Sequence, residues 1–190
     1  MTRTRGCSLV ELLVALGLGL AIIVGAVVAI TTTLRHLTSV ALRAEVDDLA
    51  YLALETFTLD VRRAGYDPRA AGIETLVEAT PARLGIQADL DGDGSIDATS
   101  EERTTLACDL AGGRFSRILG AQSLPLANGV TTCAFTYVDA AGVTLVVPPG
   151  GLDATTRRRV RRATLDLALV PIPGMTPASA RASVAVRVLP

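Results

Sequence analysis

The feature that most constrains this chain is an uninterrupted apolar run close to its N-terminus. From Leu12 to Ile30 the sequence is LLVALGLGLAIIVGAVVAI, nineteen residues without a charged or polar side chain. A helix needs roughly 20 such residues to cross the hydrocarbon core of a bilayer. The run therefore predicts a single transmembrane helix, which we place at residues 7–30.

The helical pattern continues beyond the apolar run. Apolar residues recur at steps of three to five over residues 31–65 and alternate with charged ones, as in an amphipathic helix. The sequence GYDP, which begins at Gly65, predicts where this helix stops. A helix over residues 11–64 would be about 80 Å long at about 1.5 Å per residue. We expect a separate head over residues 66–190.

The residues that precede the apolar run decide between three interpretations of the N-terminus. A secretory signal is disfavoured, because the run is longer than usual and Glu11 stands at its beginning. A lipoprotein is excluded by order, because Cys7 precedes the run. The third interpretation is a cut on the cytoplasmic side after Gly6, with Arg3 and Arg5 holding a short leader inside.

The stretch RGCSLVE resembles the class III signal of type IV pilins and type II secretion pseudopilins. That signal has a short basic leader, Gly before the cut and Glu at the fifth mature position, and Glu11 is fifth when Cys7 is first. The resemblance implies a leader over residues 1–6, cleavage between Gly6 and Cys7 by a prepilin peptidase, and N-methylation of Cys7, where the family usually has Phe.

The resemblance also implies a role in assembly for Glu11. A carboxylate in lipid seeks a cation, and the freshly cut N-terminus of a neighbouring subunit supplies one at membrane depth. The alternative is a plain single-pass anchor in which Glu11 lies at the level of the lipid headgroups.

A second stretch narrows the subgroup. TLDVRRAGYDP, which begins at Thr58, resembles the segment that ends the long helix of PilW- and GspJ-type minor subunits. This resemblance implies a minor pilin of a type IV pilus (a fimbrium) that acts in priming or tip assembly, or else a minor pseudopilin of a type II secretion system. The implied partners are other pilins, the prepilin peptidase and the inner-membrane assembly platform. The implied location is the bacterial inner membrane for the precursor and a periplasmic or extracellular filament afterwards.

Beyond Pro68 the apolar periodicity changes from that of a helix to the two-residue period of strands. Strands are predicted over residues 82–90, 103–110, 113–119, 131–147, 162–172 and 181–189, with a hairpin tip at Asp139–Gly142. A long helix followed by antiparallel strands is an α+β arrangement, and the resemblance implies the type IV pilin-like fold.

A carboxylate-rich loop, DLDGDGSID, separates two of these strands; we call residues 89–97 the acidic loop. The residues that fit the calcium-binding EF-hand pattern are Asp89, Asp91, Asp93, Ser95 and Asp97. The acid expected at the twelfth position is missing, because Ser100 stands there and Glu101 follows one residue late. Both a Ca²⁺ site and a hydrated Asp-Gly turn fit this loop. A secreted or membrane-tethered calcium-binding module without a filament role is therefore an alternative function.

The cysteines divide into one at the membrane end, Cys7, and two in the head, Cys108 and Cys133. If the head lies outside the cytoplasm, the pair in the head is expected to form a disulfide. Closing that loop would stabilise the fold by about 3.5 kcal/mol in the chain-entropy description. The alternative is two buried free thiols.

Five arginines gather in the sequence TTRRRVRR; we call residues 157–162 the arginine segment. Its members, Arg157, Arg158, Arg159, Arg161 and Arg162, form either an anion-binding patch or the solvated edge of a strand. The segment lacks aromatic stacking partners and the net charge is −1, so we favour the solvated edge and expect no nucleic-acid partner. The sequence shows no catalytic constellation, and the single histidine, His36, has no metal-ligand spacing around it. We therefore expect that this chain is not an enzyme.

Overall fold

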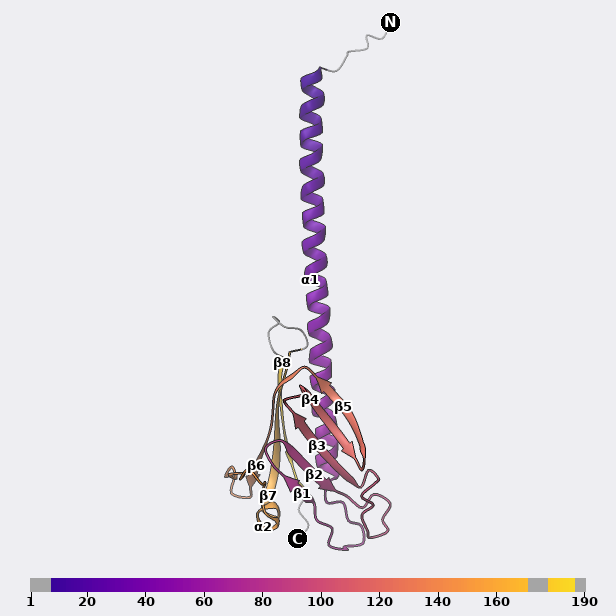
Figure 1. Ribbon diagram of the computed structural model, residues 1–190, viewed down its shortest axis with the longest axis vertical. Coiled ribbons are helices and arrows are strands. Elements are labelled where there is room, and N and C mark those ends of the chain that lie inside the picture. Colours follow the sequence, from indigo (N-terminus) through magenta and orange to yellow (C-terminus); the bar gives the residue numbers. More distant parts are fainter. Residues whose placement is uncertain (1–7, 171–177, 187–190) are drawn as a thin grey trace. The chain divides into compact units, whose positions relative to one another are not determined.

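The computed structural model describes residues 8–170 and 178–186. Helices and strands follow one another in the order α1, β1 to β6, α2, β7, β8 (Figure 1). The chain divides into two compact units, Met1–Ala44 and Glu45–Pro190. The boundary lies inside α1, so the last turns of that helix belong to the C-terminal unit.

The first element, α1, is a helix of 55 residues, Leu9–Arg63, and confirms the predicted helix to within two residues at each end. Arg62 and Arg63 lie in its last turn, where cations are favourable to the helix dipole. Gly65 has a φ of 72°, a left-handed conformation that suits glycine after a helix. Its N–H donates to the carbonyl of Gln87 at 2.7 Å, so the chain leaves the helix bonded to a strand.

A five-stranded antiparallel sheet follows, in the order β1-β2-β3-β4-β5. Its strands are β1 Leu76–Ala79, β2 Arg83–Gln87, β3 Arg103–Asp109, β4 Arg114–Leu119 and β5 Gln122–Asn128. The sequence predicted β2, β3 and β4, whereas β1 and β5 were missed. Pro125 in β5 is accommodated because β5 lies at the edge of the sheet.

The second sheet has three antiparallel strands, β6 Val130–Asp139, β7 Val160–Leu169 and β8 Ala178–Ala185. Its order is β6-β7-β8, so β7 is the central strand. The prediction that the arginine segment guards an edge strand is therefore wrong. A short helix, α2 Ala154–Arg157, precedes β7 and is capped by Asp153.

The hairpin tip after β6 agrees with the prediction, whereas the segment that returns from it and the bounds of the last strand differ. The tip at Asp139–Gly142 is confirmed by the bond from the Gly142 N–H to the Asp139 carbonyl, 3.1 Å. The returning segment, however, forms only one bridge, Val138 with Thr144; the prolines that follow lack the N–H groups needed to extend a ladder. The predicted strand 181–189 corresponds to β8, and its last three residues lie outside the described part.

The core lies between the last turns of α1 and the two sheets (Figure 1). The buried apolar residues of the helix recur every three or four positions: Val46, Ala50, Ala53, Phe57 and Val61. The Phe57 ring lies 6.1 Å from that of Phe135 in β6, which lies 6.3 Å from that of Phe115 in β4. Each such ring contributes roughly 1.5–3 kcal/mol by leaving water. A long helix packed on antiparallel sheets confirms the α+β prediction.

Two links join the sheets. Cys108 of β3 and Cys133 of β6 form a disulfide with a Cα–Cα distance of 5.6 Å, which confirms the predicted pairing. Tyr137 of β6 donates from its hydroxyl to the carbonyl of Thr80 at 2.8 Å. Burial, followed by the nearby charge of Glu78, raises the pKa of Tyr137, so the phenol keeps its proton and remains a donor.

Candidate functional site

The N-terminal unit presents an exposed apolar surface. The large apolar residues of α1 from Leu9 to Val40 are exposed. No part of the apolar run is buried against the rest of the described protein. Among the described residues, α1 is the one helix long and apolar enough to cross a membrane. Such a helix at an N-terminus serves as a membrane anchor or as a signal segment.

Glu11 lies in the first turn of α1 and is exposed. It is the only acidic residue between Leu9 and Ala44, and a carboxylate in a first turn is favourable to the helix dipole. The predicted cleavage and methylation positions, Gly6 and Cys7, lie outside the described residues. The predicted role of Glu11 in assembly therefore rests on the sequence motif.

The junction between α1 and the sheets carries a cluster of charges around one buried carboxylate, Asp60. Asp60 is 3% exposed and accepts two bonds from Arg117 of β4, from Nε at 2.8 Å and from Nη2 at 3.2 Å. Its Oδ1 also lies 2.8 Å from Nη2 of Arg63. Arg63 reaches onward to Glu101 at 3.1 Å and to the hydroxyl of Thr104 at 3.2 Å. The cluster thus binds the helix end to the central strands and to the segment that follows the acidic loop.

The acidic loop is organised around two buried carboxylates, Asp89 and Glu102. Asp89 accepts bonds from the backbone N–H groups of Gly92, Asp93 and Gly94 at 2.7 to 3.1 Å. Glu102 accepts from those of Leu90, Asp91 and Asp97 at 2.8 to 3.3 Å. The loop is therefore folded around its own acids.

The structure groups a different set of carboxylates from the set predicted as calcium ligands. Oxygens of Asp89, Asp91 and Glu102 lie within 4.8 Å of one another, which is compatible with a common cation. Glu102 stands thirteen residues after Asp89, two later than the EF-hand spacing, and was missed for that reason. Calcium binding stays a prediction, now placed on these three carboxylates.

The remaining predicted ligands bond locally. Asp93 accepts from the backbone N–H and hydroxyl of Ser95 at 2.7 and 2.8 Å. Asp97 accepts from the N–H and hydroxyl of Thr99 at 2.8 and 2.7 Å. These bonds lower the pKa of Asp93 and of Asp97, so both carboxylates stay charged at neutral pH. Neither belongs to the three-carboxylate cluster.

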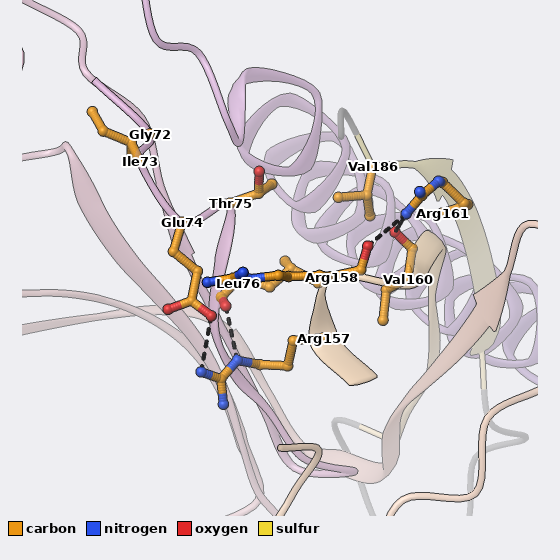
Figure 2. A pocket seen from close by; sticks show the side chains of 10 residues that line it. All are labelled: Gly72, Ile73, Glu74, Thr75, Leu76, Arg157, Arg158, Val160, Arg161 and Val186. Atoms are coloured by element: carbon orange, nitrogen blue, oxygen red, sulfur yellow. Dashed lines mark hydrogen bonds and ion pairs between the residues drawn. The ribbon is translucent and has the colours of Figure 1, made fainter. Parts of the chain in front are cut away.

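The arginine segment is divided by the fold. Arg157 donates to the carbonyl of Leu76 at 2.9 Å and pairs with Glu74 at 3.0 Å (Figure 2). It also donates to the carbonyl of Leu152 at 3.0 Å. Arg159 pairs with Asp139 at 3.3 Å. Within the described residues, Arg158, Arg161 and Arg162 form no ion pair with a carboxylate. Only these three arginines therefore remain available for the predicted anion patch.

A crevice of about 490 Å³ lies beside the arginine segment (Figure 2). It is lined by the chain leading into β1, residues 72–76, by Arg157, Arg158, Val160 and Arg161, and by Val186 after β8. Leu76, Val160 and Val186 in this lining are buried. The crevice therefore combines apolar walls with guanidinium groups.

Comparisons with known proteins give no guide to the family. No protein-family model matches the chain, and no curated protein matches it.

Proposed function

We propose that this chain is a minor pilin of a type IV pilus, with a structural and not a catalytic role. The observation that carries the proposal is α1 itself. One helix of 55 residues has an exposed apolar N-terminal part and a C-terminal part packed on antiparallel sheets. A helix of this kind has an anchor and a spine in one element, as a type IV pilin-like fold requires.

The sequence motif supports the same proposal. A prepilin peptidase would hydrolyse the peptide bond between Gly6 and Cys7, leaving the new amine on Cys7, where methylation would follow. Removal of residues 1–6 takes away Arg3 and Arg5, the charges that hold the leader in the cytoplasm. The head, carrying a disulfide, would lie in an oxidising compartment.

In this proposal Glu11 guides the docking of the subunit onto its neighbour in the filament. Its carboxylate stands at the head of the apolar surface, where a charge without a partner is disfavoured by a few kcal/mol. Pairing with the N-terminal amine of a neighbouring subunit would remove that cost. The other pilins, the peptidase and the inner-membrane assembly platform are the partners.

The first test is mass spectrometry of the N-terminal peptide from cells with and without a prepilin peptidase. A peptide that begins at Cys7 only when the peptidase is present is the expected result. A chain that begins at Met1 or Thr2 in both strains would identify a plain anchor, and one that begins at Ile30 a secreted domain. Both outcomes refute the proposal.

A variant series tests the assembly step. Glu11→Ala should prevent incorporation into filaments while cleavage continues, and Glu11→Asp should retain some incorporation. Glu45→Ala, which removes an exposed acid farther along the same helix, is the matched control and should assemble normally. Assembly that is indifferent to Glu11→Ala would instead favour a tethered module, including the calcium-binding alternative. Secretion assays in the same strains distinguish a pilus subunit from a type II pseudopilin.

A further inference from the structure

The crevice beside the arginine segment carries positive charge that its own unit leaves unpaired. Arg157 is neutralised by Glu74. Arg161 donates to the carbonyls of Arg158 and Val160 at 2.7 and 3.3 Å, and carbonyls do not neutralise its charge. In the part of the chain that the structure describes, Arg158 also has no carboxylate partner. The crevice therefore fits a ligand with an apolar group next to one or more acids.

The acidic loop of the same unit has that composition. Leu90 is 41% exposed and is followed by exposed carboxylates at Asp91, Asp93 and Asp97. Across the described residues, none of these three acids forms an ion pair with an arginine side chain. An exposed leucine beside unpaired acids thus complements an apolar crevice beside unpaired cations.

The loop is also held in one shape. The Asp89 N–H donates to the carbonyl of Tyr66 at 2.8 Å, and Arg69 donates to the carbonyl of Asp93 at 3.2 Å. Together with the bonds to Glu102, these contacts fix the loop before any partner arrives. Little conformational freedom would be lost on binding, which favours affinity.

We propose that the crevice receives the acidic loop of a second copy of this chain. Leu90 of one copy contacts the apolar lining of the other, and Asp91 and Asp93 face Arg158 and Arg161. The contact joins two different surfaces, so it is heterologous and can be repeated from copy to copy. It uses only the C-terminal unit and does not depend on the function proposed above.

The experiment uses the full chain in detergent micelles with a chelator, so that no cation occupies the loop. A photo-crosslinking residue replaces Leu90 in an equal mixture of ¹⁴N- and ¹⁵N-labelled copies. The expected product is a mixed-label crosslink to residues 157–161 of the other copy, in a yield that falls with salt. Crosslinks confined to one copy, or directed to other segments, overturn the inference.

Charge reversal supplies the second arm. Asp91→Arg/Asp93→Arg in both copies, or Arg158→Glu/Arg161→Glu in both, should lower the mixed-label yield by about tenfold, because like charges then face each other. Mixing one variant with the other should restore it. Arg114→Glu, which reverses an exposed arginine elsewhere in the unit, is the control and should change the yield little.

Rescue on mixing also excludes misfolding as the cause of the loss, since two unfolded variants could not restore each other. Equal losses with the Arg114→Glu control, or no rescue, refute the interface. The outcome is separable from the proposed function, because the crosslink is scored whether or not the chain is cut after Gly6. A correctly processed chain without the crosslink refutes this interface alone.

Discussion

Asp60→Asn tests whether the charge cluster around the buried Asp60 holds the end of α1 to the sheets. The substitution keeps the shape of the side chain and removes its charge. Arg117, whose side chain is 12% exposed, then keeps only Glu101 as an acidic partner, at 3.8 Å. A largely buried cation that loses its main partner is then held away from water with little compensation.

The expected loss is about 3 kcal/mol of the free energy of unfolding of the C-terminal unit. Removing one partner of a buried pair costs about 3–5 kcal/mol, and the low end applies because Arg117 is not fully buried and Glu101 stays nearby. With a urea slope of about 2 kcal/mol per M, the midpoint would fall by about 1.5 M.

Pulse proteolysis of the full chain in detergent micelles across a urea series measures this shift. The matched control is Glu78→Gln, which breaks a pair with Arg83 of the same 2.8 Å length but 35–46% exposed. Exposed pairs contribute about 0–1 kcal/mol, so this midpoint should move little. The double variant Asp60→Leu/Arg117→Met should recover much of the loss, because neither charge is then buried unpaired. If Asp60→Asn moves the midpoint no further than Glu78→Gln, burial does not decide the strength of this contact.

Three other predictions concern the C-terminal unit. Replacing Cys108 and Cys133 together by alanine should lower the free energy of unfolding by about 3.5 kcal/mol; an unchanged midpoint in the same proteolysis assay would contradict this. Millimolar Ca²⁺ should raise the midpoint of the full chain, and Glu102→Gln should remove that increase, whereas a midpoint indifferent to Ca²⁺ and chelator would favour the hydrated turn. A bond from Arg63, then the charge of Arg117, lowers the pKa of Glu101 from its ordinary value of 4.5. Its contribution to stability is therefore complete above about pH 4.5 and is lost as the pH falls through the lowered pKa. Stability measured from pH 7 into acid should decline less in Glu101→Gln than in the wild type, and parallel curves would exclude this role.

The sequence predicted the elements whose signals are long or repeated. For the 55-residue helix, the apolar run, the helical period and the stop signal at Gly65 all predict the same element. β1 has only four residues and shows no clear alternation, so it could not be recognised. β5 was not predicted because it contains Pro125. Proline occurs both in edge strands and in loops, so the sequence alone does not identify such a segment as a strand. The arginine segment suggested an edge because charge commonly protects edges, but three of its five arginines precede β7.

The candidate sites were predicted less completely for a related reason. Motifs record spacing along the chain, whereas a side chain meets its neighbours in space. Glu102 was missed because it stands two residues later than the EF-hand pattern places its last acid. Glu101, next to it in sequence, faces Arg63 and Arg117 instead. Asp60 lies 57 residues before Arg117, and no local pattern relates them.

The closed edge of the five-stranded sheet has a consequence for how copies of this protein meet while folding. At β1, the carbonyls of Leu76 and Ala79 are taken by the side chain of Arg157 and by the Leu152 N–H. A partly folded copy that reaches this edge finds those acceptors already occupied by side chain and loop. Recruitment of foreign strands there is discouraged. Strand-to-strand stacking of the amyloid kind is therefore disfavoured at this edge when many copies are close together. The side chain of Arg157 is partly removed from solvent to achieve this.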